Sequence, residues 1–252
     1  MFRTEDIIVH QNSEDLIVAQ LIKFGVVIIP GYFNNQVVEF LRKEFHFALS
    51  QQQENNFIKP FHYSEGAGCV VAKEKIDKSI LPYTYNVFST LFMSNLTNKY
   101  LRTKVVLNEV IYFVKDIVGS KHVANDLHFD VLRAFKFFIY LNDTTIKNGA
   151  FACVPGSHIK AIEIRKKYGD KISYDNRELT RELPYTEKDA VPLEGKAGTL
   201  IIFDTNVFHR AGIVSDGERW VMRGHSYLSP NEISNRIENK FFKKVKSLFS
   251  IR

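Results

Sequence analysis

The sequence predicts a mainly β protein with flanking helices, arranged as a jelly-roll-type barrel. The helical signals come first, between about residues 13 and 99. From about residue 104 onward, short β-rich runs are separated by turn signals such as Asn148-Gly149, Pro155-Gly156 and Asp216-Gly217. No repeat or linker is visible in the 252 residues. Helices followed by many short strands favour one domain, in which helices pack on the outside of an antiparallel barrel.

The N-terminal part is expected to be largely helical, up to about residue 103. Polar capping residues followed by apolar stripes predict helices over residues 13–23, 34–50 and 79–99. The run VVIIP, residues 26–30, is continuously apolar and predicts a short buried strand.

Seven β-rich runs make up the predicted barrel, which extends over about residues 104–229. In chain order they are KVVLNEVIYFVK, DLHFDVL, AFKFFIYL, GAFACV, GTLIIFD, FHRAGIV and RWVMRGHSYL. A helix around residues 160–168 and a polar loop through Asp189 are expected to interrupt the series.

Charge and cysteine content limit the class of protein. The formal net charge of +6 fits an anionic substrate, a membrane surface or nucleic acid, and equally an ordinary basic surface. The two cysteines, Cys69 and Cys153, are far apart in sequence, which favours a reducing compartment. The N-terminus has no apolar signal region, and no apolar run approaches the ~20 residues of a membrane span. We therefore expect a soluble, cytoplasmic protein without a transmembrane segment, and the sequence leaves its oligomeric state open.

The C-terminal tail, NRIENKFFKKVKSLFSIR, predicts a basic amphipathic helix over about residues 231–250. Such a helix packs on the barrel or on a dimer partner, or it docks on a membrane surface. A further alternative is a membrane- or nucleic-acid-binding module that uses this tail. That alternative leaves the residues described next unexplained, so we expect no specific nucleic-acid partner.

The most informative residues are His128, Asp130 and His209. Residues two apart on a strand point to the same face, so His128 and Asp130 can reach one metal ion, and a barrel can bring His209 opposite them. Two imidazoles and one carboxylate are the ligand set of non-haem Fe(II) oxygenases. With 8 His and 28 acidic residues, about one H-x-[DE] triplet is expected by chance, so a buried His with a hydrogen-bonded Asp is the alternative.

Three cations are candidates for binding a carboxylate near this metal site. Arg219 follows His209 by ten residues, and the turn between them can return it toward the metal. Arg223 shares its strand face and is a rival, and a surface ion pair is the alternative for Arg219. Lys136 lies in the apolar run FKFFIY, so it needs a buried anion or a lowered pKa, or it reaches solvent from the barrel edge.

The pattern LHFD, FKFFIYLNDTTIKNGAFACVPGSH, GTLIIFDTNVFHRAG and ER resembles the phytanoyl-CoA dioxygenase (PhyH-like) family of Fe(II)/2-oxoglutarate oxygenases. The resemblance extends from about Val106 to Tyr227 and includes the opening segment GVVIIPGYF. It implies a double-stranded β-helix, a cupin-like jelly-roll barrel. It also implies that His128, Asp130 and His209 bind iron.

The resemblance assigns Arg219 to the far carboxylate of 2-oxoglutarate, although its distance from His209 is a residue shorter than in many members. Lys136 is a second candidate for this carboxylate or for an anionic substrate. Many members carry a hydroxyl residue two places after the distal histidine, where this chain has Ala211. One hydrogen bond to the co-substrate is therefore expected to come from elsewhere. Halogenases related to the family replace the metal-binding carboxylate, so Asp130 favours hydroxylation.

The resulting hypothesis is a hydroxylase that uses Fe(II), 2-oxoglutarate and O2 to oxidise a C–H bond of a small, anionic, lipid- or sugar-linked substrate. A jelly-roll protein that binds metal without turnover is the alternative. The polar segments 51–68 and 115–126 are expected to form a lid over the site. Barrel residues near the metal are either pocket or core, namely Tyr112, His122, Arg133 and Trp220.

Overall fold

The computed structural model describes residues 4–10, 13–51, 53–54, 57–102, 105–182 and 184–228. The predicted C-terminal helix over about residues 231–250 lies outside these residues. The helices are α1 (Glu14–Phe24), α2 (Asn35–Ser50), α3 (Pro82–Val87), α4 (Leu91–Leu101) and α5 (His158–Tyr168). The strands are β1 (Val26–Ile29), β2 (Ile58–Tyr63), β3 (Gly66–Ala72), β4 (Val110–Ile117), β5 (Ala134–Tyr140), β6 (Ala152–Val154), β7 (Val191–Pro192), β8 (Leu200–Asp204), β9 (Phe208–Arg210) and β10 (Glu218–Tyr227).

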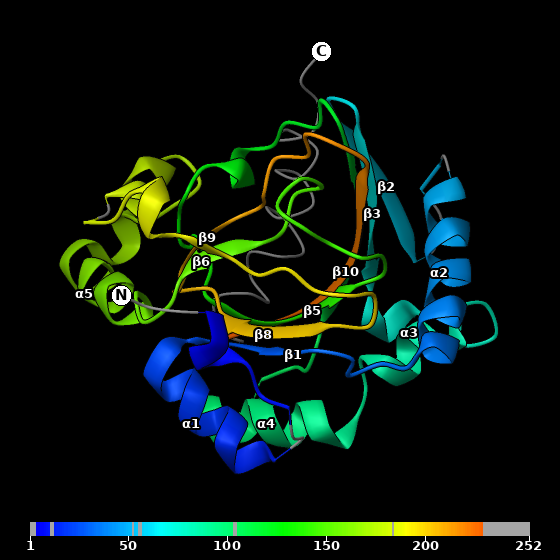
Figure 1. Cartoon of the computed structure of the whole chain (residues 1–252), viewed down its shortest axis with the longest axis horizontal. Coiled ribbons are helices and arrows are strands. Elements are labelled where there is room, and N and C mark those ends of the chain that lie inside the picture. Colours follow the sequence, from blue (N-terminus) through cyan, green and yellow to red (C-terminus); the bar gives the residue numbers. More distant parts are fainter. Residues whose placement is uncertain are drawn as a thin grey trace.

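Two antiparallel sheets form the predicted jelly-roll (Figure 1). The larger sheet has seven strands in the order β1-β8-β5-β10-β4-β3-β2, and the smaller has three in the order β7-β6-β9. In Figure 1, α1 and α4 lie beside β1 and β8, whereas α2 and α3 lie beside the edge formed by β2 and β3. The predicted fold class, mainly β with helices on the outside, is therefore confirmed.

The large sheet is buried on both of its faces, as β5 illustrates. Phe135, Phe137 and Ile139 belong to the outer cluster, which lies between the sheet and the N-terminal helices. Phe138 and Tyr140 belong to the inner cluster, which is shared with strands of the small sheet. Consecutive side chains on a strand point to opposite faces, so Lys136 faces the inner side together with Phe138 and Tyr140.

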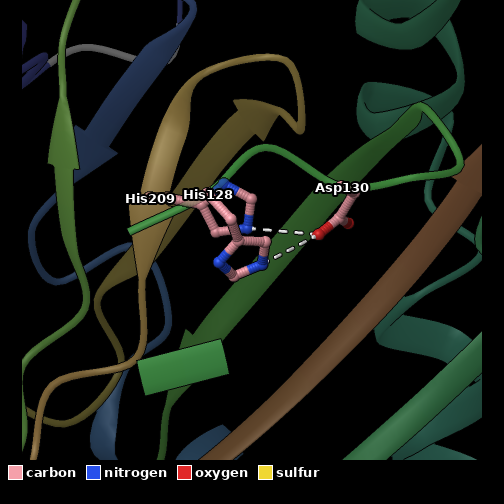
Figure 2. Close-up of side chains that lie close together, drawn as sticks. All are labelled: His128, Asp130 and His209. Carbon is pink, nitrogen blue, oxygen red and sulfur yellow. Dashed lines mark ion pairs between the residues drawn. The ribbon is translucent and has the colours of Figure 1, made fainter. Parts of the chain in front are cut away.

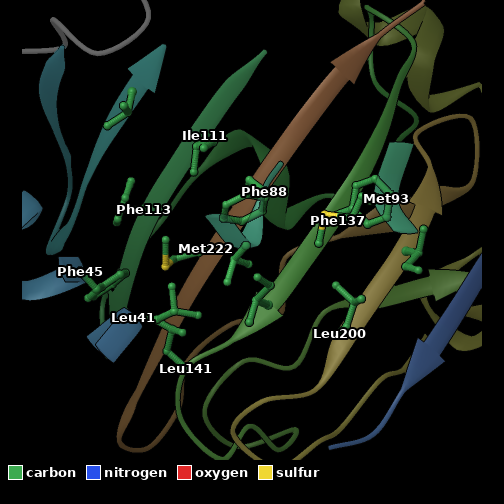
Figure 3. Packing of buried hydrophobic residues seen from close by; sticks show 14 of the residues in the cluster. Leu41, Phe45, Phe88, Met93, Ile111, Phe113, Phe137, Leu141, Leu200 and Met222 are labelled. Atoms are coloured by element: carbon green, nitrogen blue, oxygen red, sulfur yellow. The ribbon is translucent and has the colours of Figure 1, made fainter. Parts of the chain in front are cut away.

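The outer cluster holds the N-terminal helices against the sheet. In Figure 3, Leu41 and Phe45 of α2 lie over Phe113 of β4, and Met222 of β10 lies beside them. Fully burying one such side chain contributes about 1.5–3 kcal/mol, so this cluster is a main source of the stability of the fold. None of the helices in the described ranges combines the length and the apolar character needed to cross a membrane.

The first two helices follow the prediction closely. The side chain of Asn34 caps α2 by accepting a hydrogen bond from the amide of Val37 at 3.0 Å. Gly25 ends α1 with a φ of 72°. A Cβ atom there would lie 2.4 Å from the side chain of Val207, so only glycine fits this turn between α1 and β1.

The prediction of a single third helix over residues 79–99 is wrong, because two helices occupy this segment. Pro82 lies in the first turn of α3, where its missing N–H has no cost. The hydroxyl of Thr90 accepts a hydrogen bond from the amide of Met93 at 3.3 Å and starts α4. These two start signals within nine residues divide the segment.

The sequence predicts a lid over residues 51–68, but half of this segment belongs to strands β2 and β3. Residues of β2 pair with β3, and β3 pairs with β4, so this hairpin extends the large sheet at its edge. Gly68 allows the ring of Phe61 to pack on the backbone, since a Cβ atom would lie 2.4 Å from that ring.

Candidate metal centre

Three potential metal ligands converge beside the inner cluster, namely His128, Asp130 and His209 (Figure 2). His209 lies on β9. The predicted strand around His128 is only an isolated bridge to His209. The amide of His128 donates to the carbonyl of His209 at 3.0 Å, and the amide of His209 donates back at 2.7 Å. The amide of Asp130 donates to the carbonyl of Thr205 at 3.0 Å, so the β8–β9 connection fixes the carboxylate.

The three donor atoms have the spacing of one metal site. Nε2 of His128 lies 3.5 Å from Oδ1 of Asp130, and Nε2 of His209 lies 3.4 Å from the same oxygen. Bonds of about 2.1 Å to a single ion, at angles near 90°, put donor atoms roughly 3 Å apart. All three donor atoms lie within 4.8 Å of one another (Figure 2), which is compatible with one triangular face of an octahedral site.

Backbone carbonyls orient both imidazoles. Nδ1 of His128 lies 2.7 Å from the carbonyl of Asp126, and Nδ1 of His209 lies 2.7 Å from the carbonyl of Val207. A carbonyl only accepts, so each Nδ1 carries a proton and each ring, when neutral, turns a lone pair on Nε2 toward Asp130. Burial lowers the pKa of His209 to about 4. Lone pairs facing a carboxylate oxygen repel each other, and a divalent cation between them removes the repulsion, so the donor set fits iron(II).

Lys136 lies on the other side of the same carboxylate. Its Nζ atom is 2.6 Å from Oδ2 of Asp130, and its side chain is 6% exposed, so it does not reach solvent from the barrel edge. Burial opposes ionisation of Asp130, but the ammonium group of Lys136 holds the pKa of this carboxyl well below its usual range. The two oxygens of Asp130 therefore differ: Oδ2 is paired with an ammonium group, and Oδ1 is left to the histidine nitrogens.

Arg219 is buried and ion-paired. Its Nε and Nη2 atoms donate to Oδ2 of Asp116 at 3.1 and 2.6 Å, and Nη1 donates to the carbonyl of Gly149. The side chains of Arg219 and Asp116 are 4% and 10% exposed, so the pair is not the surface ion pair that the sequence left open. Tyr63 of β2 donates its hydroxyl to Oδ1 of Asp116 at 2.5 Å, so the hairpin missed by the sequence helps to hold this pair.

The remaining candidates separate onto the two faces of the sheet. Trp220 faces α2, where its ring lies 5.9 Å from that of Phe45, and it belongs to the core. Arg223 faces inward, with its guanidinium carbon 4.9 Å from the centre of the Tyr112 ring. Burial, with the charge of Arg223 as the second cause, lowers the pKa of His122 to about 4. Tyr112 and His122 therefore lie near the inner arginine, whereas Trp220 does not.

Sequence reasoning missed a clamp that α5 provides on the metal-binding segment. Arg165 donates through Nε to the side chain of Asn206 at 2.7 Å, through Nη1 to the carbonyl of Val131 at 2.9 Å, and through Nη2 to the carbonyl of Asp130. Its guanidinium also lies 4.8 Å from the centre of the Phe129 ring. A basic residue on an amphipathic helix carries no local sign of such a role.

Comparisons with known proteins identify the family of this chain and structures with a similar fold. Residues 22–221 match the profile of the phytanoyl-CoA dioxygenase (PhyH) family. A phytanoyl-CoA dioxygenase of Arabidopsis thaliana is 28% identical over 145 residues, which are 56% of this chain and 49% of that protein. The chain thus spans about half the length of the curated relatives it matches.

Solved structures with a similar fold include two enzymes of nogalamycin biosynthesis. The epimerase SnoN, in complex with Fe3+, α-ketoglutarate and nogalamycin RO, has a TM-score of 0.59 and 15% identity, over 86% of this chain and 83% of that one. The α-ketoglutarate-dependent carbocyclase SnoK has a TM-score of 0.59 and 15% identity, over 86% and 88%. SnoN therefore binds the metal and co-substrate pair that the sequence predicts here. With its profile matched over residues 22–221, the chain belongs to the phytanoyl-CoA dioxygenase (PhyH) family.

Proposed function

We propose that this chain is an Fe(II)- and 2-oxoglutarate-dependent dioxygenase that hydroxylates a C–H bond of a small organic substrate. The observation that carries the proposal is the convergence of two histidine Nε2 atoms on Oδ1 of Asp130 at 3.4 and 3.5 Å. Backbone carbonyls hold both Nδ1 protons away from this point. Membership of the PhyH family supports the same assignment.

His128, Asp130 and His209 would hold the iron on one face and leave the opposite positions open. Bound together, iron and 2-oxoglutarate supply the oxidation, in which O2 is consumed, 2-oxoglutarate becomes succinate and carbon dioxide, and C–H becomes C–OH. The chain's own part is to orient the ligands and the substrate carbon. The rings of Phe151 and Phe203, which belong to the inner cluster, exclude water from the imidazole of His209. Their ring centres lie 5.5 and 5.1 Å from the centre of that imidazole.

Arg219 is our candidate for the far carboxylate of 2-oxoglutarate. A guanidinium has five N–H donors, and the bonds to Asp116 and Gly149 use three of them. The two N–H groups that remain, one on Nη1 and one on Nη2, form the terminal edge of the guanidinium. This edge suits a carboxylate that accepts two parallel hydrogen bonds. Asp116 would fix the direction of this edge before the co-substrate arrives.

Lys136 is assigned a different role from the co-substrate contact that the sequence suggested. Because its ammonium group is 2.6 Å from Oδ2 of Asp130, it is expected to keep that oxygen away from the metal and to hold Asp130 as a ligand through Oδ1 alone. A carboxylate that binds through one oxygen leaves more of the coordination sphere open for the co-substrate and oxygen.

The type of product depends on more than the metal ligands, because similar structures include an epimerase and a carbocyclase. Hydroxylation is favoured here by the resemblance noted in the sequence. An experiment with labelled O2 separates the outcomes, since only hydroxylation transfers oxygen from O2 to the product.

The binding part of the proposal is tested without knowing the substrate. Fe(II) and then 2-oxoglutarate are added to the protein under anaerobic conditions, and a metal-to-ligand charge-transfer band is expected. Asp130→Ala and His209→Ala should abolish the band, whereas Lys160→Met, a change on the exposed side of α5, should retain it. A wild-type protein that binds the metal but develops no band with 2-oxoglutarate would support a jelly-roll protein without turnover.

A further inference from the structure

The inner face of β10 carries two nitrogen-bearing side chains that the proposed chemistry does not use. Val221 belongs to the inner cluster and Met222 to the outer cluster, so Arg223 and His225 also face inward. In the sheet, His225 is the neighbour of Lys136, and Arg223 is the neighbour of Tyr112. Both residues therefore lie beside the candidate metal centre rather than in the helical layer.

Both side chains have a buried nitrogen without a partner. Nε of Arg223 and Nε2 of His225 are buried and have no hydrogen-bond partner among the described residues. His225 is 6% exposed, and its Nδ1 lies 3.4 Å from the hydroxyl of Tyr227. When that hydroxyl donates to Nδ1, Nε2 carries the proton and becomes a donor. Buried polar atoms are nearly always satisfied, so two on adjacent inward positions of one strand indicate an absent acceptor.

Two cations at the centre have a carboxylate partner, whereas Arg223 has none. Asp130 is paired with Lys136, and Asp116 is paired with Arg219. No carboxylate in the described part of the chain lies within ion-pair distance of Arg223. Its guanidinium group lies over the ring of Tyr112 instead. Iron(II) and the dianion of 2-oxoglutarate cancel each other. Arg223 is thus a cation beside the centre without an acidic partner in the described part of the chain, and an anion from outside the chain would suit it.

2-Oxoglutarate is not that anion, given the proposed function. Once its keto-acid end chelates the metal, a single carboxylate remains. Arg219 and Arg223 are four residues apart on one strand, which separates their Cα atoms by about 13 Å, and we assign this carboxylate to Arg219. Asp116 already directs the terminal edge of Arg219, whereas no acidic residue directs Arg223, which is partly exposed and therefore accessible to a molecule that enters later.

We propose that Arg223 and His225 form a receptor for an oxyanion of the substrate, a carboxylate or a phosphate, and so place the target carbon at the metal. This inference rests on the proposed function and adds the substrate class. A planar guanidinium with an unused Nε matches the oxygens of such a group. The imidazole of His225 adds a second donor in the tautomer whose Nε2 carries the proton. The ring of Tyr112, which touches both Arg223 and His225, forms an apolar side of the receptor.

The first measurement is the affinity for 2-oxoglutarate, taken from the anaerobic charge-transfer band of the Fe(II) protein. Arg223→Met should leave this affinity within about twofold of wild type, whereas Arg219→Met should lower it by more than about tenfold. If Arg223→Met lowers it as much as Arg219→Met does, Arg223 belongs to the co-substrate and the inference is overturned. A wild-type protein without the band contradicts the proposed function instead, so the two failures are distinguishable.

The second measurement is calorimetric titration of the Fe(II)/2-oxoglutarate protein, without oxygen, with inorganic phosphate and separately with benzoate. Saturable binding of at least one probe is expected, and the stronger probe identifies the kind of oxyanion. Arg223→Met should lower the affinity for the stronger probe by at least about tenfold, and Arg223→Lys should retain part of this affinity. Lys160→Met, which removes one exposed charge, should leave the affinity unchanged. Binding of neither probe, or binding that Arg223→Met and Arg223→Lys both leave unchanged, overturns the receptor.

Discussion

The ammonium group of Lys136 lies 2.6 Å from Oδ2 of Asp130, while Oδ1 of the same carboxylate faces the histidine nitrogens. The lysine thus places an ammonium group on the outer side of a metal ligand. Both partners are largely shielded, since their side chains are 6% and 22% exposed. The carboxylate therefore has a compensating charge whether or not a metal ion is bound.

Replacing Lys136 with methionine should destabilise the metal-free protein by about 3–5 kcal/mol, because the change leaves a buried carboxylate without its cation. A divalent metal ion restores the compensation, so added metal should raise the melting temperature of the variant more than that of wild type. The measurement is thermal unfolding with and without Fe(II) or Co(II), and Lys160→Met is the matched control. Equal metal-induced shifts, combined with a weaker affinity for 2-oxoglutarate, would instead favour the co-substrate role that the sequence suggested.

Asp116→Asn should weaken binding of 2-oxoglutarate, although Asp116 is not expected to touch it. The carboxylate receives two hydrogen bonds from Arg219 through one oxygen, and an amide holds the guanidinium less firmly and removes the charge. We expect a loss of about tenfold in affinity, equivalent to about 1.4 kcal/mol, with metal affinity unchanged. Titration of the charge-transfer band measures the first quantity and calorimetry with metal alone measures the second.

The milder change Tyr63→Phe removes the hydrogen bond to the other oxygen of Asp116 and a longer one, at 3.5 Å, to the carbonyl of Lys115. It should weaken 2-oxoglutarate binding by less than Asp116→Asn does. An unchanged affinity in Asp116→Asn would mean that Arg219 is not the residue that holds the co-substrate.

Much of the barrel could be predicted because its strands carry strong local signals. GTLIIFD and AFKFFIYL are apolar runs bounded by turn residues, and they became β8 and β5. The hairpin of β2 and β3 could not be predicted, because its sequence contains Pro60, Gly66 and Gly68, which are typical of loops. It is a strand pair because β3 finds a partner in β4, which is a long-range contact without a local pattern.

The candidate site likewise contains residues with a local signal in the sequence and residues without one. Lys136 was noticed because a cation inside an apolar strand is unusual, and its inward direction followed from the alternation of side chains along β5. Asp116 and Arg165 were missed. Their partners are 103 and 35 residues away in the sequence, and an Asp in a strand or an Arg in a helix is ordinary by itself. Such supporting residues emerge only from the tertiary structure.

Arg165→Met should lower metal affinity although Arg165 touches none of the donor atoms. The side chain fixes the carbonyls of Asp130 and Val131 and the side chain of Asn206, so its loss frees the segment that carries the carboxylate ligand. Outer residues of this kind typically change metal affinity by 10- to 100-fold, and we expect about tenfold. Calorimetry with Co(II) or Fe(II) measures it, with Lys160→Met on the same helix as the control.

Partial recovery in Arg165→Lys would support positioning through charge and hydrogen bonds. A variant that binds metal as tightly as wild type, with the same unfolding temperature, would show that the loop is held without this clamp.

The stability of the metal-free protein should depend on pH through His122. Its Nδ1 accepts a hydrogen bond from the amide of Ala124 at 3.0 Å, which requires an unprotonated nitrogen. Burial and then Arg223 lower its pKa to about 4, against about 6.5 in the unfolded chain. Between these values the unfolded chain binds a proton that the folded chain does not. The contribution of the neutral His122 ring to the unfolding free energy is therefore fully present above pH 6.5 and is lost as the pH falls toward 4.

The contribution of His122 should amount to about 2 kcal/mol, less than the full pKa difference gives, because the ring is partly exposed. Urea unfolding at several pH values, with a chelator present, measures it. In His122→Gln the fall in unfolding free energy between pH 6.5 and 4 should be smaller by this amount, while His62→Gln, a change at an exposed position of β2, should follow wild type. Identical pH profiles for His122→Gln and wild type would mean that His122 titrates normally in the folded protein, and that Ala124 does not hold it in the neutral form.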